Sequence, residues 1–388
     1  MLNNNKKKLG YTTNNKVQLL YSGKPYFDKL LSLIQQAKHS IHLQIYIFDE
    51  DETGNQIAKE LMVAAQRGVA VYLMPDGYAS KNLSDNFINK LTESGIDFRY
   101  FEPLLKSENF YFGRRLHHKI TVVDGYYSLV TGNNISNKYN DMPNQPAWMD
   151  WGVYAEGDIS KELYEVCLQV WCKINKLHKK PVHTTIANTI NEKCLVRVRR
   201  NDWVKRYNQI SRSYMDMIST ASSHVVIMSS YFIPGWFIRK RLSNATKRGV
   251  KIKVIVTGVS DVLITKAAEC YMYRWLHKKN IEVYEYTRGV LHSKLSTKDS
   301  NWVTVGSYNV NNLSAYASVE LNLDIADEAF AKSTEKELKK IIKEDCILVT
   351  PELYEHRYNF IKKSLQFLSY LTVRVMINVS TFYFKRKN

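Results

Sequence analysis

Cysteine is scarce in this sequence, and its placement argues against two common roles. The five cysteines are Cys167, Cys172, Cys194, Cys270 and Cys346. No two of them are spaced as CxxC, and no group of cysteines and histidines has zinc-finger spacing. An odd number of scattered cysteines does not suit a disulfide scaffold either. We therefore expect reduced, mostly buried thiols in a cytosolic protein.

A long apolar run is missing from the opening sequence, MLNNNKKKLGYTTNN, so we expect neither a signal peptide nor an N-terminal membrane anchor. Acidic residues are outnumbered, because 37 Asp and Glu face 55 Lys and Arg, a formal charge of +18. Such an excess indicates a polyanionic partner, either nucleic acid or an anionic membrane surface. Hydrophobic residues make up 45% of the chain, which is enough for an ordinary globular core.

The sequence contains an internal repeat. Three segments that each predict a helix followed by a strand recur in the same order in both halves: 26–48 and 213–233, 58–74 and 238–256, 87–103 and 271–287. The second pair shares an Arg-Gly-Val, at Arg67 to Val69 and at Arg248 to Val250, where glycine suits a helix C-cap that leads into a strand. The alternative is two unrelated α/β domains.

Alternation of helix and strand predicts an α/β fold in which each half is a mixed β-sheet flanked by helices. We expect a polar tail at 1–15, a first domain at 16–178, a linker at 179–200 and a second domain at 201–345. A C-terminal amphipathic helical segment is expected at 346–388.

One constellation occurs at the same point of both halves and has the pattern H-x-K-x-x-x-x-D-x-x-x-x-x-x-G-S-x-N. The second half matches every position with His292, Lys294, Asp299, Gly306, Ser307 and Asn309. The first half has His117, Lys119, Asp124 and Asn134, with Thr131 and Gly132 in place of Gly-Ser. Either motif alone would be weak, because its ordinary explanation is a surface histidine near a lysine.

The spacing has a physical meaning. His117 and Lys119 are two apart at the expected start of an apolar strand, so both side chains project to one face, whereas His118 projects to the other and is expected to be structural. Asp124-Gly125 predicts a turn, and the returning strand brings Asn134 back towards the motif. Asp124 and Asp299 are expected to hold the hairpins rather than to touch substrate.

Histidine, lysine and asparagine together suit a phosphate group. Histidine can act as nucleophile or general acid, and lysine neutralises phosphate oxygens. We expect Asn134, Asn309 and Ser307 to bind the phosphate. Two copies supply two histidines, so that one attacks phosphorus while the other protonates the leaving oxygen.

These paired motifs resemble the HKD signatures of the phospholipase D superfamily. NKVQLLYSG, HLQIYIF, DGYAS, SSYFIP and VGSYNVNNLSAYASVELNLDI further resemble cardiolipin synthases, of the compact kind without N-terminal transmembrane helices. The resemblance implies two pseudo-twofold-related phospholipase D-like domains packed around one shared active-site cleft. It also implies a catalytic set of His117, Lys119, Asp124, His292, Lys294 and Asp299.

The resemblance implies transfer of a phosphatidyl group from one phosphatidylglycerol to another through a phosphohistidine, with release of glycerol. No cofactor or metal is expected; the sequence has neither a P-loop nor a carboxylate cluster for Mg²⁺. Family members carry an acidic residue after each motif that orients the catalytic imidazole, a role that falls to Asp150 and Glu320. Family tendency assigns His117 as nucleophile and His292 as general acid and base, although the sequence treats them alike.

The tail after Tyr358 has an apolar helical stripe formed by Ile361, Leu365, Leu368, Leu371, Val375, Val379 and Phe382. Arg374 interrupts it, which favours a helix lying in the membrane interface over a simple spanning helix. A helix packed on the protein's own core, a membrane-spanning hairpin and a tilted span remain alternatives. We expect a peripheral protein on the cytoplasmic side of the cell membrane.

Three other functions compete with this interpretation. A superfamily nuclease would use the same histidine pair and suits the charge, but small nucleases of this type carry one motif per chain, and nucleic acid is not the partner we expect. A phosphatidylserine synthase or a hydrolytic phospholipase D would differ only in the acceptor. A non-catalytic membrane-binding protein is disfavoured by two intact motifs. The oligomeric state is left open.

Overall fold

The structure is a computed structural model that describes residues 10–103, 114–174, 190, 192–311, 314–315 and 318–385. The chain divides into two compact units. The first is Met1–Val198 with Val305–Ser307 and Val319–Ile325, and the second is Arg199–Thr304 with Tyr308–Ser318 and Ala326–Asn388. Residues 196–200, expected in the linker, lie in strand β9 (Val196–Asp202). The limits of the domains stay a prediction.

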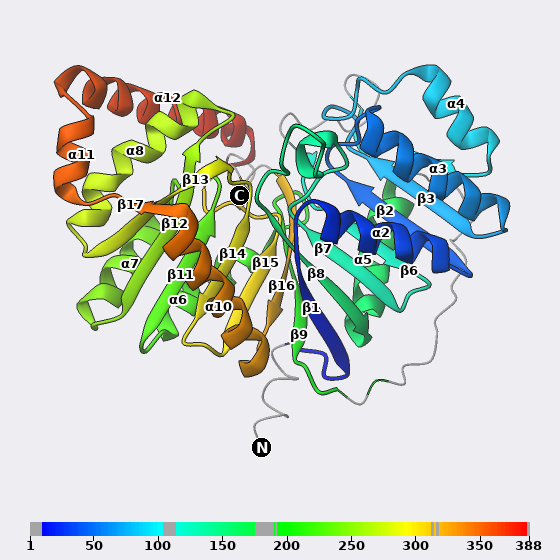
Figure 1. Ribbon diagram of the computed structural model, residues 1–388, viewed down its shortest axis with the longest axis horizontal. Helices are drawn as coiled ribbons and strands as arrows, with labels where there is room; N and C mark the ends of the chain where they lie inside the picture. The colour runs from blue at the N-terminus through cyan, green and yellow to red at the C-terminus, as the bar shows by residue number, and fades with distance from the viewer. Residues whose placement is uncertain are drawn as a thin grey trace. The chain divides into compact units, whose positions relative to one another are not determined.

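The first unit is built on a mixed sheet. Its strands follow the order β1 (Asn15–Tyr21), β8 (Trp151–Gly157), β7 (Tyr127–Thr131), β6 (Ile120–Val123), β2 (Ser40–Ile45), β3 (Ala70–Pro75) and β4 (Asp97–Phe98). The pairs β2–β3 and β3–β4 are parallel, and the other pairs are antiparallel. Helices α2 (Lys24–Gln36) and α3 (Glu52–Gln66) cover one face, and α5 (Asp158–Ile174) covers the other (Figure 1). Helix α4 (Asp85–Glu93) precedes β4.

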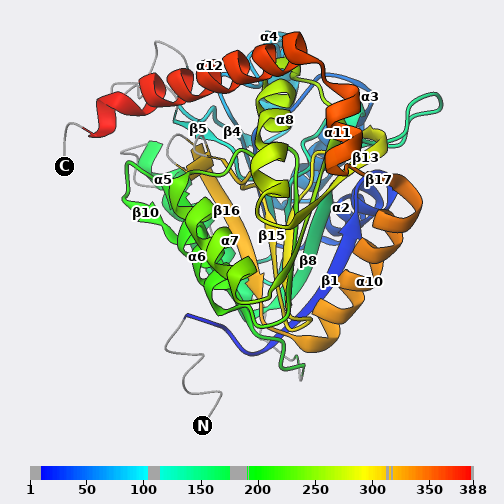
Figure 2. The same ribbon diagram turned by 90° about the vertical axis from the view of Figure 1, so that its left-hand side faces the viewer.

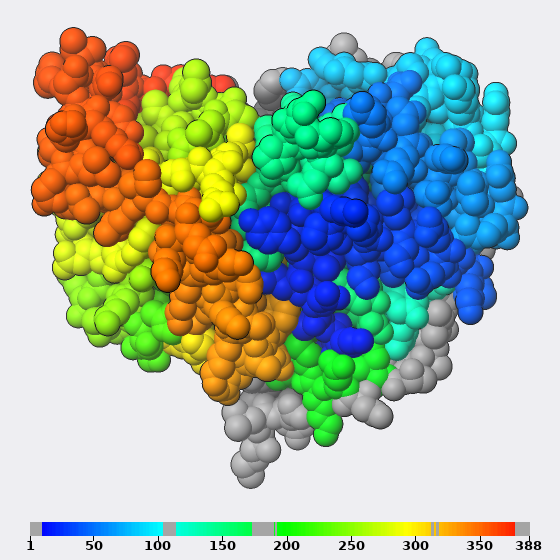
Figure 3. Space-filling view, in the orientation of Figure 1, coloured from blue at the N-terminus to red at the C-terminus, as the bar shows by residue number. Residues whose placement is uncertain are grey.

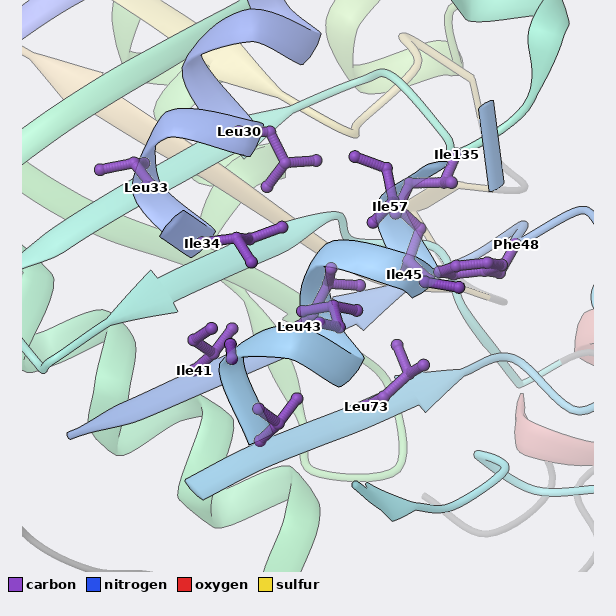
Figure 4. Close-up of a cluster of buried hydrophobic side chains, with 14 of the residues drawn as sticks. Leu30, Leu33, Ile34, Ile41, Leu43, Ile45, Phe48, Ile57, Leu73 and Ile135 are labelled. Carbon is purple, nitrogen blue, oxygen red and sulfur yellow. The ribbon is translucent and has the colours of Figure 1, made fainter. Parts of the chain in front are cut away.

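Alternation along β2 explains this layering, because successive side chains of a strand point to opposite faces. Ile41, Leu43 and Ile45 are buried against α2 and α3 (Figure 4). Between them, His42 and Gln44 point towards α5, where Gln44 donates to the carbonyl oxygen of Cys167. Burying an aliphatic side chain of this size contributes about 1.5–3 kcal/mol.

The Arg-Gly-Val of each half ends a helix in the same way. Gly68 and Gly249 both have φ of +87°, a conformation that favours glycine and lets the chain turn from helix to strand. Arg67 donates to the carbonyl oxygens of Ile34, Gln35 and Ala37 at the end of α2. Arg248 repeats this with the carbonyl oxygens of Ile218, Ser219 and Ala221. The repeat is therefore structural as well as sequential.

The second unit has the same helix and strand order as the first: α6 (Gln209–Thr220), β11 (His224–Ser229), α7 (Trp236–Lys247), β12 (Lys251–Val259), α8 (Leu263–His277) and β13 (Ile281–Val290). Its strands follow the order β15 (Trp302–Gly306), β14 (Lys294–Lys298), β11, β12, β13 and β17 (Cys346–Leu348). Strand β10 (Tyr207–Asn208) pairs with β9. Figure 2 shows α6 and α7 on one face of this sheet and α10 (Glu328–Asp345) on the other. The predicted order of elements is confirmed in both halves.

The C-terminal segment was expected to be helical throughout, but it begins with strand β17. Helices α11 (Pro351–Arg357) and α12 (Phe360–Lys385) follow, and α10 and α11 (orange) lie at the surface of this unit in Figure 3. Helix α12 crosses α8, with Tyr370 and Val373 packed against Ala268 and Met272 (Figure 2). Within the described part of the chain, no helix has both the length and the apolarity needed to cross a membrane.

Candidate active site

His117 of the first motif is held by a segment distant in sequence. It follows β5 (Arg115–Leu116), and its backbone N–H donates to the carbonyl oxygen of Val319 over 3.0 Å. Its Nδ1 lies 2.9 Å from Oε2 of Glu320, in strand β16 (Ser318–Ile325). A carboxylate accepts hydrogen bonds, so Nδ1 carries the proton and Nε2 presents a lone pair. Glu320 thus fixes the tautomer that a nucleophilic imidazole needs.

Sequence order associates Glu320 with His292, the histidine of its own motif, but its contact is with His117. The carboxylate is fully buried, and Oε2 also accepts a hydrogen bond from Oγ of Ser307. Its Oε1 has no hydrogen-bond partner among the described residues. A buried carboxylate with so few donors favours a positive neighbour, so Glu320 would stabilise His117 as an imidazolium. Ser307 donates its hydroxyl to this carboxylate, and its expected binding of phosphate stays a prediction.

The departure of the first motif from Gly-Ser has a steric cause. A Cβ added at Gly132 would lie 2.3 Å from Oδ2 of Asp150, so a side chain fits there only if that carboxylate moves or is replaced. Backbone bonds from Gly132 to Trp151 and from Ser307 to Leu321 show that Asp150 is the counterpart of Glu320. The first half therefore combines glycine with the shorter acid, and the second combines serine with the longer one. Asp150 is fully buried, and its Oδ1 accepts from the amide of Trp151.

Lys119 lies against an aromatic ring that the sequence analysis did not single out. Its buried ammonium nitrogen is 5.1 Å from the ring centroid of Tyr46, and it donates to the carbonyl oxygen of His117. The ring of Tyr46 also meets that of His117 edge-on, with centroids 4.9 Å apart. Burial raises the pKa of Tyr46 to about 12, so the phenol stays neutral. The motif's histidine and lysine thus project to one side, as predicted.

The second motif is arranged differently around its lysine. Nζ of Lys294 lies 2.9 Å from Nδ1 of His292 and 3.1 Å from Oγ of Ser230. Ser230 in turn donates to Oδ1 of Asn309 over 3.1 Å. An ammonium can only donate, so Nδ1 of His292 accepts and its proton resides on Nε2. These four side chains form one buried polar chain in the second unit, with the motif's Asn309 at its end.

Tyr46 and Ser230 occupy equivalent positions in the repeat. Ile41 pairs with Val123, just before Asp124, and Val225 pairs with Lys298, just before Asp299. Five residues further along each chain stand Tyr46 and Ser230. Aligning the two halves would have revealed this pair of residues, although not their contacts. The two motifs, alike in sequence, therefore sit in different surroundings.

Asn134 is placed in the framework. Its Oδ1 accepts from the backbone amide of Ile47 over 3.1 Å, and its Nδ2 donates to the hydroxyl of Tyr139 over 2.9 Å. The hairpin does return as expected, because the amide of Thr131 donates to the carbonyl oxygen of Lys119. Phosphate binding by Asn134 and Asn309 stays a prediction.

Asp124 and Asp299 anchor the hairpins to the preceding loops. Asp124 accepts from the amides of Lys38, His39 and Ser40, and Asp299 accepts from those of Ser222, Ser223 and His224. Both have positive φ, 53° and 48°. Burial alone would raise the pKa of Asp299, but these amides outweigh it and hold the pKa below its usual value. His118 is also structural, with Nε2 2.9 Å from Oε1 of Gln44.

One further residue in each half fixes the backbone just before the motif histidine. Oδ2 of Asp76 accepts from the amide of Leu116 over 2.8 Å, and Oγ1 of Thr257 accepts from the amide of Leu291 over 3.2 Å. Asp76 lies within DGYAS and directly follows β3, but no feature of the sequence there indicates this role. Asp76 and Thr257 are positioning residues, since they touch the chain rather than the reacting atoms.

One geometric expectation was wrong. The strands begin at Ile120 and Lys294, so His117 lies before its strand and not at the start of it, and His292 likewise precedes β14. Because His117 lies outside β6, its backbone N–H donates to the carbonyl oxygen of Val319 and not to a neighbouring strand of β6. Among the described residues, no group of three or more His, Cys, Asp or Glu is placed to hold a metal ion. The site offers imidazole, ammonium and carboxylate groups suited to attack on a phosphodiester.

Comparison with known proteins agrees with this chemistry. A sequence model described as cardiolipin synthase, PLD-like domain, matches residues 30–149 and 214–342. Cardiolipin synthase B of Escherichia coli (strain K12) is 33% identical over 367 residues, covering 93% of this chain and 89% of that protein. The enzyme of the same name from Shigella flexneri is similar to the same extent.

Among solved structures, the phosphatidylserine synthase of Haemophilus influenzae Rd KW20 superposes with a TM-score of 0.69 at 14% identity, covering 99% of both chains. That likeness shows the shared fold. The predicted fold class and enzyme class are therefore confirmed: two phospholipase D-like α/β domains of a phosphatidyltransferase. The chain belongs to the cardiolipin synthase family of phospholipase D-like proteins.

Proposed function

We propose that this protein makes cardiolipin by transferring a phosphatidyl group from one phosphatidylglycerol to another. The observation that carries the proposal is the bond between Nδ1 of His117 and Glu320, which leaves Nε2 available to attack phosphorus. In the first step Nε2 forms a bond to phosphorus, and the bond from phosphorus to the glycerol oxygen breaks. His292 gives its Nε2 proton to that oxygen while its Nδ1 takes a proton from the ammonium of Lys294, so that the ring stays neutral, and glycerol leaves.

The second step reverses the roles of the groups. The free hydroxyl of a second phosphatidylglycerol loses its proton to Nε2 of His292, whose Nδ1 returns a proton to Lys294, and the oxygen attacks the phosphohistidine. The bond from nitrogen to phosphorus breaks, and cardiolipin leaves. Lys119 and Lys294 would neutralise the phosphate oxygens as charge builds up on them. The step requires both imidazoles to meet at one phosphorus atom in a shared cleft.

The surroundings of the two histidines support this division of labour. The carboxylate beside His117 favours an imidazole that becomes cationic on attack. The ammonium of Lys294 beside Nδ1 of His292 keeps a proton on Nε2, and it can protonate Nδ1 when Nε2 gives that proton up. His117 is thus the nucleophile in this proposal, and His292 is the acid and base.

The proposal includes peripheral attachment to the cytoplasmic face of the cell membrane through α12. The expected apolar stripe is exposed where its side chains are described, at Ile361, Leu365, Leu368, Leu371 and Val375. The opposite face of α12 packs on α8. The helix therefore has one face for the protein and one for a lipid surface. Val379 and Phe382 lie outside the residues whose side chains are described.

Incubation with phosphatidylglycerol vesicles, without added metal, tests the proposal. Cardiolipin and glycerol in equal amounts are expected by lipid chromatography and glycerol assay. Phosphatidic acid as the main product would mean a hydrolase, and phosphatidylserine formed only on addition of serine would mean a phosphatidylserine synthase. Nicked DNA with unchanged lipid would mean a nuclease. Any of these three results would contradict the proposal.

A further inference from the structure

The second unit has four exposed apolar side chains at the N-terminal ends of two neighbouring helices. Trp236 and Phe237 begin α7 and are 58% and 63% exposed. Leu263 and Ile264 begin α8, and Leu263 is 81% exposed. The rings of Trp236 and Phe237 meet edge-on at 5.1 Å. We call these four residues the apolar rim. A cluster of exposed apolar side chains marks a surface that contacts a partner or a membrane.

The topology of the sheet places the apolar rim at one edge. Strands β11 and β12 are parallel, so α7 and α8, which follow them, both begin at the same end of the sheet. The hydroxyl of Tyr231 donates to Oδ1 of Asp261 over 2.6 Å, which joins the two loops that lead into the helices. The Trp236 and Leu263 ends are therefore neighbours.

The second catalytic motif lies at that same edge. Strand β14 is antiparallel to β11, and its first residue, Lys294, pairs with Ser229, the last residue of β11. His292 comes just before this pair. Ser230 follows Ser229 and contacts Lys294, so the loop from Ser230 to Trp236 runs from the motif to the apolar rim. Side chains that entered a lipid surface here would bring the motif to the level of lipid phosphates.

Helix α12 continues this surface. Ile233, in the loop before α7, packs in one cluster with Ala268 of α8 and with Tyr370 and Val373 of α12. The exposed stripe of α12 therefore belongs to the same part of the second unit as the apolar rim, as α8 and α12 in Figure 2 indicate.

The charges beside the apolar rim identify its partner. Exposed Lys240 lies with its ammonium 5.0 Å from the ring of Trp236, and Arg241 next to it is also exposed. Helix α12 adds Lys362 and Arg374, both exposed. Aromatic and aliphatic side chains bordered by cations are the pattern of an interface with anionic lipid, where cations reach the headgroups.

We propose that the apolar rim inserts into the surface of an anionic phospholipid bilayer and holds the His292 edge of the second unit at the lipid phosphates. This inference rests on the proposed function, because it supplies the route by which a lipid substrate reaches the site. The occupant is a lipid surface, and a protein partner or a second copy of the chain is an outcome that would overturn it.

The test uses the full chain with two double variants, Trp236→Ser/Phe237→Ser and Leu263→Ser/Ile264→Ser. Ile347→Ser/Leu348→Ser is a matched control, since these residues form an exposed apolar pair on β17 of the same unit. Sedimentation with phosphatidylglycerol vesicles is expected to fall about 10-fold or more in each rim variant and to stay unchanged in the control. Turnover of short-chain phosphatidylglycerol below its micelle concentration should stay within about twofold of wild type.

Vesicle binding that is unchanged in both rim variants would overturn the inference. So would a wild-type dimer that dissociates in these variants without loss of vesicle binding. If a serine variant does not fold, a second measurement tests whether Trp236 enters the lipid. Quenching of tryptophan fluorescence by brominated lipid is compared between wild type and Trp236→Phe. Loss of the quenched component supports insertion, and its persistence contradicts it. The two proposals can fail separately. If the rim variants lose vesicle binding but the wild type does not convert phosphatidylglycerol, the proposed function is refuted and the membrane contact stands.

Discussion

Nδ1 of His117 and Oε2 of Glu320 lie 2.9 Å apart, although the two residues are 203 positions apart in the sequence. The carboxylate is buried and is shared with the hydroxyl of Ser307. This contact ties His117 of the first motif to the strand that follows the second motif. The first motif therefore takes a partner from the second repeat, and both residues lie within one compact unit.

Glu320→Gln is expected to lower kcat by about 100-fold or more while leaving the fold intact, since an amide keeps the shape but does not stabilise an imidazolium. The pH dependence of kcat should shift as well, which a purely structural role would not cause. Glu328→Gln, an exposed acid at the start of α10, serves as control and should match wild type. Wild-type kcat in Glu320→Gln would remove the carboxylate from the mechanism.

Gly132→Ala should displace the carboxylate of Asp150, because the added Cβ would lie 2.3 Å from Oδ2. We expect kcat to fall at least about 10-fold, with a loss of stability on the order of 1–3 kcal/mol by urea unfolding. Gly132→Ser with Asp150→Glu rebuilds the pairing of Ser307 with Glu320. Activity in this double variant above that of either single variant is expected, and strictly additive losses would refute the compensation.

Thr257→Val removes the oxygen that accepts from the amide of Leu291 while keeping the volume of the side chain. The backbone before His292 is then free to shift, and we expect kcat to fall about 10- to 100-fold with KM little changed. Thr257→Ser retains the hydroxyl and should recover most of the activity. Equal kinetics in the valine and serine variants would show that this hydrogen bond does not position the histidine.

His42 makes the first unit sensitive to acid. Burial lowers its pKa from 6.5 to about 3, and neither ring nitrogen has a hydrogen-bond partner among the described residues. As pH falls below about 6.5, His42 binds a proton in the unfolded chain but not in the folded one. The free energy of unfolding therefore decreases from there towards pH 3. Between pH 7.5 and 5 the loss is about 2 kcal/mol.

His42→Phe should abolish this part of the pH dependence of urea unfolding, because a phenyl ring can still stack on Tyr72, whose centroid lies 4.4 Å from that of His42. His39→Gln changes the exposed histidine nearby and should retain the wild-type dependence. An unchanged difference between pH 7.5 and pH 5 in His42→Phe would contradict the assignment.

Local pattern was sufficient to predict the repeat, the order of its elements and the two motifs. His117 with Lys119 and His292 with Lys294 are close in the chain, and the glycines at 68 and 249 act through their own backbone. Glu320 could be selected as an acid but not assigned to His117, because its partner depends on how distant strands pack. Tyr46, Ser230 and Asp76 lie at the ends of ordinary buried strands, where composition does not separate a site residue from the core.

The difference between the two motifs is likewise a property of packing. The defining positions of the two motifs differ only at the small-residue pair, yet Lys119 faces the ring of Tyr46 while Lys294 contacts Ser230 and His292. In the proposed mechanism, it is these different neighbours that make His117 the nucleophile and His292 the acid. The contacts that carry this assignment could not be read from the sequence.

The most direct test of the central claim is to trap the covalent intermediate. Phosphatidylglycerol labelled in its phosphatidyl part is mixed with wild type and with His292→Ala, the reaction is quenched under alkaline conditions that preserve phosphohistidine, and the labelled peptide is identified by mass spectrometry. The account predicts label on His117 in both proteins, with no label in His117→Ala. Label on His292 in the wild type, or cardiolipin formed at full rate with no labelled protein at any time, would contradict it.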